Sequence, residues 1–97
     1  MRMARISDDA AGDMEAIWVY IATNDFNAAD RVYDELQAEI RKRAEHPGMG
    51  HTRPDFQNPD HRCWKLYSYL IVYRYDDREL VVVRVIHGAR DIGTIVR

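Results

Sequence analysis

The chain has 97 residues, of which 46% are apolar and 31% are charged. This length and composition suffice for one hydrophobic core, so we expect a single domain over residues 1–97 and exclude disordered and multi-domain proteins. The sequence holds no apolar run near the roughly 20 residues of a membrane span, and acidic residues lie where a signal peptide would be apolar. We therefore expect a cytoplasmic protein. Its single cysteine, Cys63, cannot form an internal disulfide.

The charge is slightly negative overall, with 14 Lys and Arg against 16 Asp and Glu. This balance excludes a protein whose whole surface is built to wrap nucleic acid. The two halves differ, however: residues 1–45 hold six basic and ten acidic side chains, whereas residues 46–97 hold eight basic and six acidic ones. An anionic partner would therefore meet the C-terminal half.

Two amphipathic helices are predicted in the first half, after a short extended segment at Arg2–Ile6. Ser7 is a good N-cap for the first helix, which runs to about Thr23. Asn27 is the predicted N-cap of the second helix, and the cationic residues 41–43 lie in its last turns, where they suit the helix dipole. Because so few residues separate them, the helices should form an antiparallel hairpin.

The second half predicts a long loop and then a sheet. Three prolines and two glycines punctuate residues 47–59, and a loop of this length in a small domain is often functional. Residues rich in β-branched and aromatic side chains follow, and they predict three consecutive antiparallel strands at Arg62–Tyr67, Tyr69–Tyr75 and Leu80–His87. We expect an α+β fold in which the N-terminal strand precedes a helical hairpin packed on one face of this meander, with residues 88–97 leaving the sheet.

The last hairpin predicts which strand residues face the helices. A turn centred on Asp77 would pair Leu70 with Arg84, Val72 with Val82, and Arg74 with Leu80. The almost wholly apolar face would then need the helices to cover it, and it consists of Tyr69, Ile71, Tyr73, Val81, Val83, Val85 and His87. The opposite face, with Arg74 and Arg84, would be open.

The predicted sheet gathers cationic side chains that could act on phosphate. They are Arg62, Lys65, Arg74, Arg84, His87 and Arg90. Cleavage of RNA through its own 2′-hydroxyl needs a base, an acid and charge neutralisation, which His, Lys and Arg can supply. The alternative is that these are ordinary solvated side chains on an exposed strand face.

The sequence predicts no metal site and no cofactor. The histidines at 46, 51 and 61 lie near Cys63, but their spacing matches no zinc motif, and neither CxxC nor HExxH occurs. Gly48 and Gly50 lie between two prolines and indicate a turn rather than a phosphate-binding loop.

Four segments, in this order, resemble the ParE branch of the RelE/ParE toxin superfamily. They are the helix segment at 17–29, the loop HPGMGHTRP at 46–54, the strand segment YLIVYR at 69–74 and the closing run RVIHGARD at 84–91. The resemblance covers nearly the full length. It implies the toxin of a type II toxin–antitoxin pair, which poisons DNA gyrase and is neutralised by a ParD-like antitoxin.

The resemblance also implies where the partners would bind. An antitoxin helix laid on the helical hairpin would contact Met14, Trp18, Val32 and Leu36, although these residues could equally all be core. For the gyrase contact, the best candidates on the expected open face and tail are Arg62, Arg74, Arg84, His87 and Arg90.

The RelE branch, a ribosome-dependent mRNA endonuclease, matches less well. Of its catalytic set, an arginine falls at Arg90 and a lysine near Lys65, but the other arginine falls at Leu70 and the tyrosine at Val96. Leucine and valine cannot hold phosphate or move a proton. A nuclease working through His87, Arg90 and Lys65 stays as the alternative, and a non-toxic module that only binds an antitoxin as the third.

Overall fold

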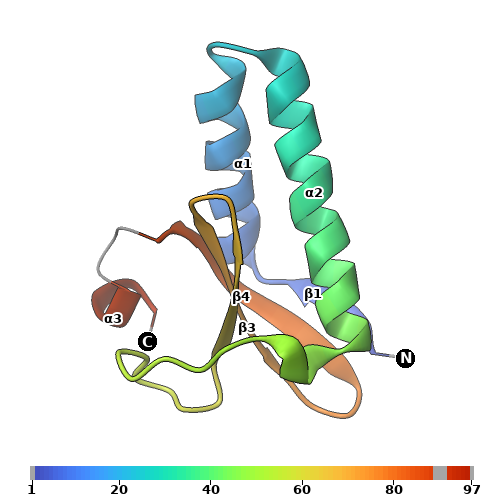
Figure 1. The fold of residues 1–97 in the computed structure, drawn as a ribbon, viewed down its shortest axis with the longest axis vertical. Helices are drawn as coiled ribbons and strands as arrows, with labels where there is room; N and C mark the ends of the chain where they lie inside the picture. Colours follow the sequence, from blue (N-terminus) through green and yellow to red (C-terminus); the bar gives the residue numbers. More distant parts are fainter. Residues whose placement is uncertain (1, 89–91, 97) are drawn as a thin grey trace.

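The computed structural model describes residues 2–88 and 92–96. Within these residues, a tall helical hairpin stands beside a four-stranded sheet (Figure 1). The elements in chain order are β1 (Met3–Ile6), α1 (Asp8–Ala22), α2 (Phe26–Glu45), the 3-10 turn η1 (Pro47–Met49), β2 (Arg62–Leu66), β3 (Tyr69–Tyr75), β4 (Glu79–His87) and α3 (Ile92–Ile95). The predicted α+β architecture is confirmed. None of these helices is long and apolar enough to span a membrane.

The strand order is β1-β4-β3-β2. The last three strands form the predicted antiparallel meander, and β1 lies parallel to β4, with Ile6 opposite Val82. Strand β1 is thus paired with β4, the last strand in chain order. The helical hairpin follows β1 in the chain.

Each long helix begins at a side-chain cap. The Ser7 hydroxyl accepts a hydrogen bond from the Ala10 amide at 3.1 Å, which confirms the predicted start of α1. In α2 the cap is Asp25, whose carboxylate accepts from the Ala28 amide at 3.1 Å. The prediction of Asn27 as the cap was wrong, because an acidic side chain two residues earlier already satisfies the free amides.

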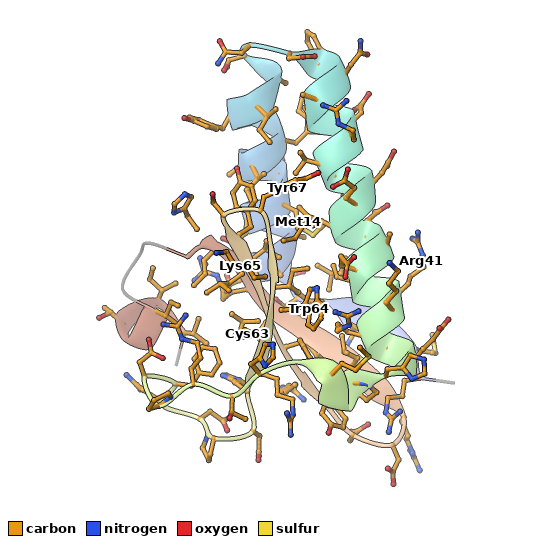
Figure 2. All side chains as sticks on the ribbon, viewed as in Figure 1. Met14, Arg41, Cys63, Trp64, Lys65 and Tyr67 are labelled. Carbon is orange, nitrogen blue, oxygen red and sulfur yellow. The ribbon has the colours of Figure 1, made fainter. Side chains whose placement is uncertain are left out.

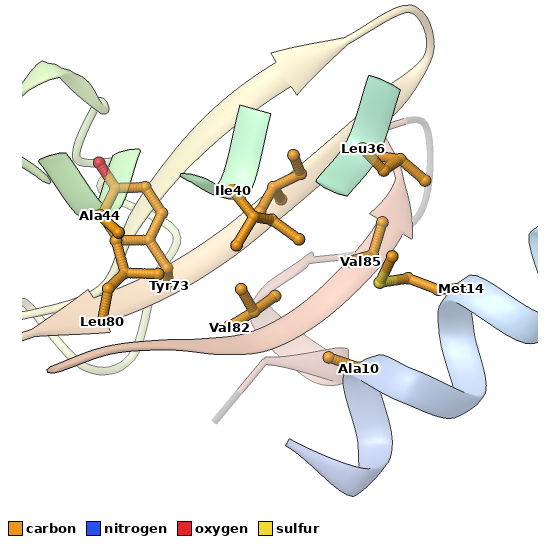
Figure 3. Close-up of a cluster of buried hydrophobic side chains, with 10 residues drawn as sticks. Ala10, Met14, Leu36, Ile40, Ala44, Tyr73, Leu80, Val82 and Val85 are labelled. Carbon is orange, nitrogen blue, oxygen red and sulfur yellow. The ribbon is translucent and has the colours of Figure 1, made fainter. Parts of the chain in front are cut away.

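The main core lies between the hairpin and the sheet (Figure 3). It is formed by Ala10, Met14, Leu36, Ile40, Ala44, Ile71, Tyr73, Leu80, Val82 and Val85. The Tyr73 hydroxyl, at the edge of this core, donates a hydrogen bond of 2.5 Å to the Pro47 carbonyl. The core thereby fixes the start of the long loop.

The predicted register of β3 and β4 was wrong. The Asp76 carboxylate accepts hydrogen bonds from the amides of Arg78 and Glu79, so pairing resumes with Tyr75 opposite Leu80. A bulge then shifts the register between Val72 and Tyr73, and beyond it Val72 faces Arg84 and Leu70 faces Ile86. Because of these shifts, Leu80 and Val82 belong to the helix-covered core, where the sequence predicted Val81 and Val83.

The face opposite the helices is covered in part by the chain itself, which corrects the prediction of an open face. A second core contains Phe56 from the loop and Ile92 and Val96 from the C-terminal segment. They pack with Cys63, Leu70, Val72 and Ile86 of the sheet. Residues 92–96 therefore return to the sheet, where the sequence predicted a departing tail.

Candidate functional site

Arg84, a predicted target-binding residue, is held by α1. Its Nε and Nη2 atoms donate to the two Asp13 carboxylate oxygens at 2.7 and 2.9 Å, and the Val85 amide donates to Asp13 as well. The hydrogen bond that Arg84 donates to Asp13 raises the pKa of Arg84. This bidentate pair locks α1 to β4. The guanidinium is thus used inside the molecule, contrary to the expectation of a free group on the open face.

Arg62 and Arg74 line one hollow at the end where β2 begins and β3 ends. The hollow has a volume of about 380 Å³, and its remaining walls are Pro59, Asp60 and Tyr75. Arg62 donates one hydrogen bond, from Nη1 to the Gly50 carbonyl at 3.0 Å. Arg74 is exposed and makes no hydrogen bond or ion pair with any residue that the structure describes. We name this hollow the Arg62–Arg74 pocket.

Lys65 and His87 line a second hollow, of about 360 Å³, at the opposite end of the β2–β3 hairpin. Arg53, Ser68, Leu70 and Gly88 complete its walls. Arg53 is held in a bidentate ion pair with Asp55, with both distances 2.9 Å. The structure thus brings together two of the three residues proposed for a nuclease. Arg90, the third, lies outside the described residues.

The predicted cationic residues therefore form two separate hollows rather than one continuous surface. The sequence located the residues on neighbouring strands, but Arg84 is held by Asp13 of α1 and lines neither hollow. Arg53 was missed, because nothing in the loop sequence indicated that it would return to the sheet beside Lys65.

Two of the four predicted antitoxin contacts are inaccessible. Met14 is 1% exposed and Leu36 is 0% exposed, so both belong to the core (Figures 2 and 3). Trp18 and Val32 are partly exposed. Trp18 donates from Nε1 to Asp30 at 2.9 Å, and its ring lies 5.7 Å from that of Phe26. Trp18 therefore ties α1 to α2, and its outer side lines a hollow with Ala11, Glu15, Asp30 and Tyr33.

A further hollow, which the sequence did not predict, lies between α1 and the β2–β3 turn. Its volume is about 390 Å³, and it is lined largely by apolar and aromatic side chains, including Ile17, Tyr20, Tyr67, Tyr69 and Val85. Tyr20 is 74% exposed and Tyr67 is 57% exposed. Tyr67 has a left-handed backbone with φ of 54°, and a hydrogen bond from its side chain to Glu35 raises its pKa (Figure 2). We name this hollow the tyrosine groove.

The histidines of the long loop do not converge on a metal. No group of three or more His, Cys, Asp or Glu side chains in the described ranges is placed to hold an ion. Instead, the His51 ring stacks on Trp64 at 6.0 Å, and His61 is buried edge-on against Phe56. Burial, followed by the positive charge of Arg74, lowers the pKa of His61. These histidines pack within the loop that closes the second core.

Comparison with solved structures identifies the fold. The chain aligns with one described as the chromosomal ParDE TA system from P. aeruginosa, with a TM-score of 0.75 and 18% identity, over 90% of this chain and 96% of that one. Sequence comparison then identifies the family, since residues 4–92 match the model for the ParE toxin of type II toxin-antitoxin systems, parDE. The chain is also 34% identical to Toxin ParE1 of Caulobacter vibrioides over 88 residues, 90% of each protein. It belongs to the ParE toxin family.

Proposed function

We propose that this toxin poisons DNA gyrase by binding and is neutralised by a ParD-like antitoxin. Membership of the ParE family over residues 4–92 supports the toxin role. The observation that carries the proposal is the separation of two kinds of surface. An apolar groove lies beside the helices, and cationic hollows lie at the two ends of the β2–β3 hairpin. One protein can therefore present different faces to an antitoxin and to its target.

The tyrosine groove is the proposed antitoxin contact. Its exposed aromatic side chains offer large apolar area at low conformational cost, which favours an amphipathic helix as the occupant. Trp18 and Val32 extend the same proposal along the hairpin. Met14 and Leu36 are buried in the main core and are not part of the proposed contact.

The cationic residues are the proposed gyrase contact. Arg62 and Arg74 line one of the two hollows, and His87 lines the other. Arg90 stays in the proposal from the sequence alone. Arg84 contributes indirectly, because its pair with Asp13 fixes β4 against α1.

Purified toxin and gyrase test this function. We expect the toxin to inhibit supercoiling of relaxed plasmid and to accumulate cleaved DNA–gyrase complex, and we expect a ParD-like antitoxin to reverse both effects. A toxin that leaves supercoiling unchanged and yields no cleaved complex would contradict the proposal. Growth without the antitoxin gives a separate readout, since a harmless chain would favour the non-toxic antitoxin-binding module.

One observation favours a ribosome-dependent nuclease as the second candidate. Lys65 and His87 share a hollow with Arg53, and a histidine beside cations can exchange protons at a phosphodiester. Against it, Leu70 is buried in the wall of that hollow, where the RelE-like pattern has an arginine. Cut transcripts in expressing cells, lost in His87→Ala, would support the nuclease, and intact transcripts would exclude it.

A further inference from the structure

The Arg62–Arg74 pocket combines two guanidinium groups from neighbouring strands. Arg62 lies opposite Tyr73 in the β2–β3 ladder, so Arg74 follows directly along β3. Both arginines lie at the end of the hairpin where β2 begins and β3 ends, and there both line the same hollow. The pocket is bounded by Pro59 on the loop side and by the Tyr75 ring on the strand side.

The free donors of this pocket exceed its internal acceptors. Arg62 uses Nη1 on the Gly50 carbonyl, while Arg74 uses none of its donors on the described residues. Asp60 is the one acidic residue in the lining. Asp76 and Glu79 also interact with Arg74. Asp76 already accepts from the amides of Arg78 and Glu79, and Glu79 is paired with Arg5 at 3.1 Å. The pocket is therefore built from donors with few acceptors to satisfy them.

His61, next to Asp60 in the chain, lies close enough to the pocket for its charged residues to act on it. It is buried against Phe56, and burial is the largest cause of its lowered pKa. The effect of Arg74, which lowers the pKa of His61, is larger than that of Asp60, which raises it. Arg2 adds a further cation at the rim, with its guanidinium 5.4 Å from the centre of the Tyr75 ring.

We propose that the Arg62–Arg74 pocket binds a phosphate group, and that in the toxin's working complex this group is a backbone phosphate of the DNA. Guanidinium groups match phosphate because their planar donors form paired, charge-assisted hydrogen bonds. Asp60 disfavours the anion and so weakens binding. The proposal deepens the proposed function, on which its DNA part rests, by giving the chemistry of one target contact.

Phosphate binding by the toxin alone is the direct test. Inorganic phosphate is titrated at constant ionic strength, and the arginine Nε–Hε signals are followed by NMR. We expect saturable shifts for Arg62 and Arg74, and about tenfold weaker binding in Arg74→Ala. Arg41→Ala is the matched control, because it removes the same charge from an exposed position on α2 (Figure 2). Equal binding in the two variants would overturn the proposal.

A variant that is expected to strengthen phosphate binding makes the test sharper. Asp60→Asn removes the acidic wall and should tighten phosphate binding severalfold, and this gain does not depend on a folding defect. Arg74→Lys keeps the charge but loses the planar donors, so it should bind at an intermediate level. Unchanged binding in Asp60→Asn would contradict a phosphate held beside this carboxylate.

The source of the phosphate is decided by comparing a short DNA duplex with a nucleoside monophosphate. An Arg74-dependent complex with the duplex, displaced by inorganic phosphate, supports a backbone phosphate. Binding of the monophosphate without the duplex overturns the DNA assignment. Because no gyrase is present, failure of this binding is distinguishable from failure to inhibit supercoiling. Loss of the first alone refutes the pocket, and loss of the second alone refutes the proposed function.

Discussion

At the scale of single residues, the ion pairs of this protein differ in burial and in the hydrogen bonds that they make. Asp13 accepts three hydrogen bonds from Arg84 and Val85, and the side chains of the pair are 16% and 24% exposed. Arg5 and Glu79, in contrast, form a pair at the surface. A partly buried bidentate pair resists solvent screening better than an exposed one. Charged residues that cannot be told apart in the sequence therefore differ in how much they stabilise the fold.

We expect Asp13→Ala to destabilise the fold by about 2 kcal/mol, because it leaves a partly buried guanidinium and an amide without their acceptor. The measurement is urea unfolding followed by circular dichroism. Glu79→Ala is the control, since it breaks the exposed pair and should cost clearly less. Equal losses in the two variants would show that the Asp13–Arg84 pair does not lock α1 to β4.

We expect His61 to make stability fall in mild acid. It is 3% exposed, its Nδ1 has no partner among the described residues, and burial lowers its pKa. Below its ordinary pKa of about 6.5 the unfolded chain takes up a proton that the folded chain refuses. The stability present above that pH is therefore lost as the pH falls toward the lower folded pKa.

Urea midpoints between about pH 8 and about pH 5 measure this loss. His61→Leu should remove part of the slope, and His46→Gln, at an exposed position, should retain it. A slope unchanged by His61→Leu would mean that other groups account for the acid sensitivity.

At the scale of elements, local patterns predicted the helices and strands well. The cap at Ser7 and the bounds of Tyr69–Tyr75 agree with the structure, because capping and β-branched runs are local signals. The bulge near Val72 is not a local signal. It adds one residue on β4, and a shift of one residue is enough to exchange faces. For this reason the sequence placed Leu80 and Val82 on the wrong face, although it predicted their strand.

The C-terminal segment provides an element-scale prediction. Ile92 is 2% exposed in the second core, so Ile92→Ala should cost about 2 to 5 kcal/mol through the cavity it leaves. Ile95→Ala, at a partly exposed position of the same turn, should cost much less. Denaturant unfolding compares the two. Similar small losses would show that residues 92–96 do not stay on the sheet in solution.

At the scale of the whole molecule, the sequence predicted that helices pack on one face of a sheet. It did not predict where the hollows on the surface lie. The tyrosine groove joins residues from α1, the β2–β3 turn and β4, which no single pattern connects. The two cationic hollows depend on a loop that folds back over the sheet. Contacts of this kind arise from tertiary packing, so the sequence alone could not separate the apolar groove from the cationic hollows.

The pairing of β1 with β4 bears on how the toxin is made. Met3 lies opposite Glu79, and the Ser7 hydroxyl donates to the Val83 carbonyl. Strand β1 therefore cannot pair until β4 has been made. Such distant pairing delays formation of the sheet until β4 has been synthesised. We therefore expect a growing chain on the ribosome to lack the finished sheet and both hollows beside β2 and β3. The proposed antitoxin, if made first, would therefore be present before the sheet of the toxin has formed.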